Sequence, residues 1–79
     1  MLMAEKTRGL PLPHLREWRV KKLIGQSELA DKAGLARATV TRAERGDTVV
    51  SFINIRRLAE VLGISPDELL GAPPADGGE

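Results

Sequence analysis

The sequence predicts an all-α fold, a bundle of five short helices. Apolar residues recur at helical spacing in several stretches, and a glycine that can end a helix stands directly after three of these stretches. No stretch alternates between apolar and polar residues as a half-buried strand does, so we expect no strands. The clearest helical stripe lies in the second half of the chain and consists of Phe52, Ile55, Leu58, Ala59 and Leu62.

The first predicted helix follows a segment without periodic apolar residues. Residues 1–11 end in a proline-containing run that favours extended backbone, and we interpret them as a flexible N-terminal arm. Pro13 suits the first position of a helix because its missing N–H would have no partner there. This helix is expected to reach Lys22, with Leu15 and Trp18 on its apolar face.

The next two helices form the most informative unit of the chain. Residues 26–33 place Leu29 and Ala33 on one face of a short helix, and Gly34 provides the turn. A second helix then extends from about residue 37 to Gly46. Two helices joined by so short a turn form a helix-turn-helix, whose second helix lies in the DNA major groove in proteins that use this motif.

Two further helices complete the domain. Ser51 is a good N-cap for the stripe that ends at Gly63. Residues 65–68 combine a serine cap, a proline and two acids, which together indicate the start of a short helix over residues 67–70. We therefore place the folded domain at residues 12–70 and a disordered tail at residues 71–79.

Composition excludes several classes of function. The 79 residues contain no cysteine and a single histidine, His14, so we expect neither a disulfide nor a metal site. No nucleophile has a base beside it, and nothing indicates an enzyme or a cofactor. The apolar runs are too short for a membrane span, and the N-terminus lacks the apolar core of a secretion signal. We expect a cytoplasmic protein.

The charge distribution favours a nucleic-acid partner more than the net charge of +1 does. Residues 12–46 carry eight basic and four acidic side chains, whereas residues 47–79 carry two basic and six acidic ones. The chain therefore has a basic half and an acidic half, and the helix-turn-helix lies in the basic half.

Four motifs occur here in an order that resembles one known family. They are LREWR on the first helix, QSELADKAG at the turn, TVTRAERG on the third helix and LAEVLGISPDELL near the end. A chain with these motifs over residues 15–70 is similar to the phage repressor and Cro-type helix-turn-helix (Xre) family. The resemblance implies a five-helix repressor-like bundle that binds double-stranded DNA.

The resemblance also implies which residues read the bases. Arg37, Ala38 and Arg42 fall where family members contact base edges, with Thr41 beside them. The guanidinium fork matches guanine O6 and N7, and the alanine methyl suits the methyl group of thymine. The anchors of Arg37 and Arg42 differ in height by roughly 7–8 Å, so both could read bases, or one could read while the other holds a phosphate.

The remaining implied roles concern the DNA backbone and the fold. Gln26 matches a glutamine that contacts a phosphate and braces the third helix, while Thr39 and Arg45 lie where further backbone contacts are expected. Arg19 and Glu44 match a buried ion pair between the first and third helices.

Some positions depart from the family pattern. Gly25 and Ala36 replace the hydroxyl residues that usually cap the second and third helices, at a cost of about 1 kcal/mol for alanine and less for glycine. Ala43 replaces a larger aliphatic residue and Trp18 replaces a leucine, and we interpret these two changes as compensating in volume.

These observations predict a sequence-specific DNA-binding transcriptional regulator, expected to be a repressor. Because one such domain buries little surface on DNA, we expect a homodimer on a palindromic site, formed through Val49, Val50, Ile53 and the fifth helix. The alternative is a protein-interaction module on the same fold, either an antitoxin that wraps a toxin or a bridging coactivator. Such a protein partner would use the acidic half of the chain.

Overall fold

The computed structural model describes residues 9–71 and 73–74. Its elements, in chain order, are β1 (Gly9–Leu10), α2 (Leu15–Lys21), α3 (Gln26–Ala33), α4 (Arg37–Arg45), β2 (Val50–Ser51), α5 (Phe52–Leu62) and α6 (Pro66–Gly71). The predicted helical fold class is confirmed, and the described residues contain five helices and one pair of short strands. Within the described residues, no helix has the length and apolar character needed to span a bilayer.

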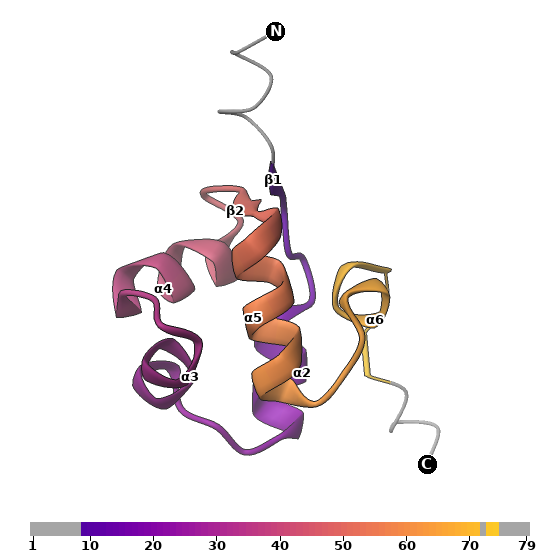
Figure 1. Ribbon diagram of the computed structural model, residues 1–79, viewed down its shortest axis with the longest axis horizontal. Coiled ribbons are helices and arrows are strands. Elements are labelled where there is room, and N and C mark those ends of the chain that lie inside the picture. The colour runs from indigo at the N-terminus through magenta and orange to yellow at the C-terminus, as the bar shows by residue number, and fades with distance from the viewer. Residues whose placement is uncertain (1–8, 72, 75–79) are drawn as a thin grey trace, which may run out of the picture.

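Helix α5 lies at the centre of the bundle (Figure 1). Helices α3 and α4 pack beside each other on one side of α5, and α6 packs on the other side. The predicted stripe supplies the centre of the core, since Ile55, Leu58, Ala59 and Leu62 are each at most 3% exposed. The first member of that stripe is an exception, because Phe52 is 46% exposed.

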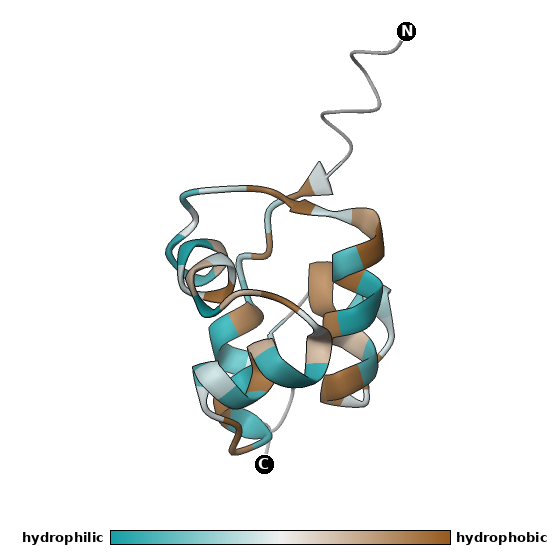
Figure 2. Ribbon diagram, turned by 60° about the vertical axis from the view of Figure 1, so that its left-hand side comes forward, coloured by the Kyte–Doolittle hydropathy of each residue, from teal (hydrophilic) through white to brown (hydrophobic). Residues whose placement is uncertain are grey.

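Each helix carries hydrophobic and hydrophilic residues on different faces (Figure 2). The buried faces of α2, α3 and α4 meet those of α5 and α6, and Leu12 before α2 joins them with 1% exposure. The buried residues outside α5 are Leu12, Leu15, Trp18, Leu29, Ala30, Ala33, Val40, Ala43, Val50 and Leu69. Trp18 and Ala43 both lie in this core. Both must be buried if the large tryptophan side chain is to compensate in volume for the small alanine.

The strand pair corrects the sequence prediction, which contained no strands. β1 and β2 are antiparallel, with Gly9 opposite Ser51 and Leu10 opposite Val50. At Gly9 a Cβ atom would lie 2.8 Å from the carbonyl oxygen of Val50, so only glycine allows the two backbones to approach this closely. Two-residue strands are too short to produce a visible alternation, which is why the sequence pattern did not reveal them.

The helix boundaries differ slightly from those predicted. Helix α2 begins at Leu15 after the N-cap His14, so Pro13 lies before the helix instead of at its first position. Helix α6 extends over Pro66–Gly71 and so includes the first residue assigned to the tail. Gly9 and Leu10, assigned to the arm, form β1, while residues 1–8, 72 and 75–79 lie outside the described residues.

Candidate nucleic-acid interface

Helices α3 and α4 are joined by the predicted tight turn. Gly34 ends α3 in the left-handed conformation with φ of 73°, a region that side-chain-bearing residues rarely adopt. The N–H of Leu35 donates to the carbonyl of Ala30 at 2.8 Å, which closes the last turn of α3. After Leu35 and Ala36 the chain enters α4, and the two helices lie side by side (Figure 1).

Helix α4 has one buried face and one free face. Val40 and Ala43 are at most 1% exposed and fix the inner face against the core. Ala38, Arg42 and Arg45 are exposed and stand at i, i+4 and i+7, which places them in one stripe on the outer face. This stripe is the part of the helix that faces away from the core.

The other predicted contact residues flank this stripe. Arg37, the first residue of α4, is exposed, and Thr39 and Thr41 are half-buried. Among the described residues, neither Arg37 nor Arg42 forms an ion pair. The structure therefore brings the four proposed base-reading residues together within the first six residues of α4, and Arg45 lies about one turn beyond Arg42.

Gln26 links α3 to α4 through both the nitrogen and the oxygen of its side-chain amide. Its Nε2 donates to Oε1 of Glu44 at 3.0 Å, and its Oε1 accepts from the hydroxyl of Thr41 at 3.4 Å. Gln26 is the first residue of α3, so these bonds hold the start of α3 against the second half of α4. The hydroxyl of Thr41 thus has a partner inside the protein before any ligand binds.

Arg19 and Glu44 form the predicted pair between α2 and α4. Nε of Arg19 lies 2.5 Å from Oε2 of Glu44, and Nη2 donates to Oε1 at 3.1 Å. The side chains are only 13% and 5% exposed, so water screens the pair weakly. Arg19 also donates from Nη1 to the carbonyl of Ile24 at 2.9 Å, which ties the turn before α3 to the same cluster.

The carboxylate of Glu44 therefore collects three charge-assisted hydrogen bonds. Two come from Arg19 and one comes from Gln26, from two different helices. Bonds of this kind are roughly twice as strong as those between neutral groups. This cluster fixes the rotation of α4 about its axis and so determines which of its residues face outward.

The N-termini of α3 and α4 lack side-chain caps, as predicted from Gly25 and Ala36. Both residues adopt the extended conformation of an N-cap, but neither supplies a hydrogen bond from its side chain. At the start of α4 the N–H of Thr39 donates to the carbonyl of Ala36 at 3.0 Å. Backbone N–H groups at the start of a helix that have no such partner favour anionic ligands.

One contact near the free face was not expected from the sequence. Arg45 Nη1 lies 3.8 Å from Oδ2 of Asp47 in the loop that follows α4, and both side chains are more than half exposed. An exposed pair at this distance contributes little to stability. It does place a negative charge beside an arginine of the outer stripe.

A helix-turn-helix family model matches residues 15–69 of the chain. An uncharacterized HTH-type transcriptional regulator of Haemophilus influenzae is 42% identical over 53 residues, which are 67% of this chain and 22% of that protein. The chain spans less than two thirds of the length of the curated relatives that it matches.

Solved structures of regulators show the same fold at substantial identity. The restriction-modification controller protein C.AhdI of Aeromonas hydrophila is 46% identical with a TM-score of 0.69, over 71% of this chain and 85% of that chain. SinR, the master regulator of biofilm formation, bound to DNA, is 33% identical with a TM-score of 0.67, over 71% of this chain and 90% of that chain. SinR of Bacillus subtilis in a complex with SinI is 33% identical with a TM-score of 0.69, over 72% and 56% of the respective chains.

Proposed function

The chain belongs to the helix-turn-helix family of Cro/C1-type (Xre) transcription regulators, and on this premise we propose that it is a cytoplasmic repressor that reads double-stranded DNA through α4. The observation that carries the proposal is the outer stripe of α4. Ala38, Arg42 and Arg45 project from a helix whose opposite face is fixed in the core. A helix held in this way fits the major groove, which is about 12 Å wide.

The proposed base contacts come from the first six residues of α4. Arg37 and Arg42 would donate to guanine, and the methyl group of Ala38 would pack against thymine. The hydroxyl of Thr41 is bonded to Gln26, so we assign to Thr41 a contact through its methyl group. Residues at the N-terminal end of a recognition helix are the ones that reach base edges in helix-turn-helix proteins.

The proposed backbone contacts surround these residues. Arg45 lies about 10 Å further along the helix axis than Ala38, where the side chain would meet a phosphate. Gln26 stands at the uncapped start of α3, beside backbone N–H groups that would donate to another phosphate. Thr39 is proposed to contact the backbone on the opposite flank of α4.

We propose that the chain binds as a homodimer to inverted half-sites. Two-fold helix-turn-helix proteins place their recognition helices one helical turn apart, roughly 34 Å, and their sites are palindromic for that reason. A single domain of this size would bury only about 600–1,000 Å² on DNA, so two copies are needed for tight and specific binding.

The experiment that tests the function is selection of bound duplexes from a random pool, followed by electrophoretic shifts. Enrichment of an inverted repeat is expected. Arg37→Ala and Arg42→Ala should each lower affinity for the selected site by about ten-fold or more, since a good base contact is worth about 1–3 kcal/mol. They should leave weak binding to unrelated DNA nearly unchanged.

Arg16→Ala is the matched control, because Arg16 is also an exposed arginine and lies on α2, outside the proposed interface. If Arg16→Ala weakens binding as much as Arg42→Ala does, α4 is not the reading helix. If no duplex is enriched at all, the proposed function is wrong.

A role in protein binding is the second candidate, favoured by one comparison. The similar protein SinR forms a complex with SinI. By analogy this chain would bind a partner protein, as an antitoxin or a bridging coactivator does. Such a role predicts capture of a specific protein that is unaffected by Arg37→Ala and Arg42→Ala.

A further inference from the structure

Helix α2 has an outer face that takes no part in the core or in the proposed DNA contacts. Arg16 and Val20 are exposed about one turn apart on this face, and Val20 is 51% exposed. Leu23 follows at the end of the helix with 89% exposure, and its N–H donates to the carbonyl of Val20 at 2.9 Å. The outer face of α2 therefore offers two exposed aliphatic side chains near a positive charge.

A groove of about 430 Å³ lies along this face. Its walls are formed by α2 and by two prolines that follow α6, and it is lined by Arg16, Glu17, Val20, Lys21, Pro73 and Pro74. Proline has no N–H, so the proline wall adds apolar surface but no backbone donor. A ligand in the groove would thus bind through apolar contacts and through the charged side chains of α2.

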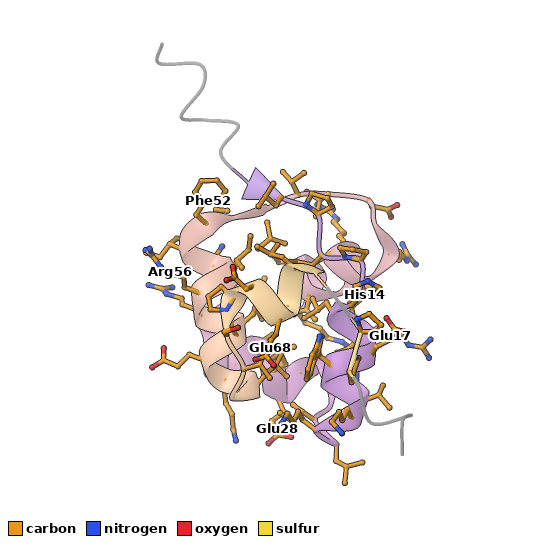
Figure 3. The ribbon with its side chains drawn as sticks, turned by 90° about the vertical axis from the view of Figure 1, so that its right-hand side faces the viewer. His14, Glu17, Glu28, Phe52, Arg56 and Glu68 are labelled. Atoms are coloured by element: carbon orange, nitrogen blue, oxygen red, sulfur yellow. The ribbon has the colours of Figure 1, made fainter. Side chains whose placement is uncertain are left out.

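The groove has a positive charge. Arg16 and Lys21 line it with two basic groups, and Glu17 is the one acid among its lining residues. The carboxylate of Glu17 is engaged by His14, whose Nδ1 lies 2.7 Å from Oε1. Figure 3 shows these two side chains beside each other on α2. Arg16, by contrast, has no hydrogen bond or ion pair with any other residue that the structure describes.

The conformation of Leu23 also indicates a contact outside the fold. Its φ of 59° lies in the left-handed region, where glycine would carry no strain. Its side chain gains almost nothing from burial, since it is 89% exposed. Residues held in such strained backbone conformations cluster at sites that bind ligands or partners. A leucine that is both strained and exposed favours a partner that covers it.

We propose that the outer face of α2 binds an acidic segment of another protein. A carboxylate of that segment pairs with Arg16, and bulky apolar side chains next to it cover Val20 and Leu23. The anchors of Arg16 and Leu23 are about 10 Å apart along the helix axis, which an extended chain spans in about three residues. The occupant is therefore a short segment in which acidic residues stand within a few positions of apolar ones.

The position of the groove leaves the proposed DNA contacts free. Arg19 connects α2 to α4 through Glu44, whereas the groove is closed by the segment that follows α6. Helix α6 lies on the side of α5 opposite to α3 and α4 (Figure 1). A protein seated on α2 could therefore be bound at the same time as DNA, which takes the inference beyond the proposed function.

Two other occupants fit this face less well. DNA would contact Arg16 and Lys21, but its phosphate backbone gains nothing from the aliphatic side chains beside them. A second copy of the chain is expected from the sequence to bind elsewhere, at Val49, Ile53 and the fifth helix, which is α6. Val50 does not belong to that expected surface, because it is 2% exposed and lies in the core.

Selection of short displayed peptides on the full chain tests the proposal. Soluble Val20→Asp chain, present in excess, removes the peptides that bind anywhere else on the domain. We expect the remaining peptides to combine acidic residues with bulky apolar ones. No enrichment, or enrichment of peptides without acidic residues, overturns the proposal.

The affinity of a selected peptide, measured by fluorescence anisotropy, locates its site. Val20→Asp and Arg16→Glu should each lower the affinity by about ten-fold or more, because both place a negative charge against the carboxylates of the peptide. Val49→Asp and Arg56→Glu are the matched controls, since these two residues are also exposed and lie outside the groove. A loss of affinity in the controls equal to that in the α2 variants overturns the assignment to α2.

Two further variants test the individual contacts. Arg16→Glu should bind a peptide whose acidic residues are replaced by lysine better than the wild type does, because the charges are again opposite. Leu23→Gly should weaken binding of the selected peptide although it relieves the backbone strain. If neither variant changes the affinity in this way, the side chains do not contact the peptide and the proposal is wrong.

Addition of duplex DNA separates this inference from the proposed function. The affinity for the peptide should be unchanged with DNA bound, and displacement of the peptide by the duplex would overturn the placement of its site. Peptide binding by a chain that selects no duplex would contradict the proposed function alone. Selection of a duplex without any enriched peptide would contradict the inference alone. Self-association that is abolished by Val20→Asp in sedimentation would assign the face to a second copy and overturn the proposal.

Discussion

At the scale of the residue, the cluster around Glu44 determines how α4 is presented. Arg19 binds the carboxylate with two nitrogens, and Gln26 adds a third bond from α3. Removing one partner of a pair that is so little exposed leaves an uncompensated charge. Arg19→Met and Glu44→Leu should therefore each cost about 3–5 kcal/mol of unfolding free energy.

The double variant Arg19→Met/Glu44→Leu should recover much of that loss, because two apolar side chains of similar volume replace both charges. Urea denaturation of the four proteins measures the coupling between the two positions. Additive losses in the double variant would mean that the pair is not a coupled unit.

Leu23 is a second residue whose conformation has an energetic consequence. Its φ is 59°, in the left-handed region, and its side chain is 89% exposed. It ends α2 where a glycine would carry no strain, and its apolar surface has no cover. Leu23→Gly should raise the unfolding free energy by up to about 1 kcal/mol.

The control at this position is Leu23→Ala, which keeps the Cβ atom and hence the strain. Thermal unfolding should give nearly the same midpoint for Leu23→Ala as for the wild type. A gain for alanine equal to that for glycine would assign the effect to the exposed side chain and not to the backbone.

At the scale of the element, the helices were predictable but the contacts that orient them were only partly so. Helical stripes and the glycine after each one located α3, α4 and α5 because these signals act within a few residues. The pairing of Arg19 with Glu44 came from the resemblance, since no local pattern relates residues 25 positions apart. The strand pair joins segments about 40 positions apart and was missed for the same reason. The contact of Arg45 with Asp47 is local but depends on how the chain turns at Gly46 after α4, and it was missed as well.

The start of α4 offers a test at the same scale. Ala36 has the backbone geometry of an N-cap, with φ of −74° and ψ of 146°, but supplies no side-chain bond. A serine hydroxyl there would accept from the N–H of Ala38 or Thr39. Ala36→Ser should therefore stabilise the domain by about 1 kcal/mol, measured as a shift of the urea midpoint at an unchanged slope.

Gly25→Ser, at the N-cap of α3, provides the comparison. Glycine is already a fair N-cap, so the gain should be only a few tenths of a kcal/mol. A larger gain in stability from Gly25→Ser than from Ala36→Ser would contradict the explanation that the missing side-chain cap at Ala36 lowers the stability of the domain.

At the scale of the whole molecule, the segregation of charge explains how a chain of net charge +1 could bind a polyanion. The exposed arginines of α4 lie in the basic half, while α6 begins with the acids Asp67 and Glu68 on the other side of α5. Repulsion between DNA and the acidic half would turn the outer stripe of α4 toward the duplex.

Because the proposed binding displaces counterions from DNA, affinity should fall steeply with salt. Arg45 of each copy of a dimer is proposed to neutralise one phosphate, and this contact alone gives log K against log salt concentration a slope of about −2. Arg45→Gln should flatten that slope by about one unit per half-site without changing the selected sequence, because its proposed partner is a phosphate.

Asp47→Asn should strengthen the contact of Arg45 with the phosphate, since it removes the carboxylate 3.8 Å from Arg45. We expect tighter binding to every duplex and unchanged discrimination among them. Titrations by fluorescence anisotropy at several salt concentrations measure both variants. Two outcomes would show that the outer stripe of α4 does not contact the phosphate backbone. One is an affinity that does not change with salt concentration, and the other is an Asp47→Asn variant that binds no better than the wild type.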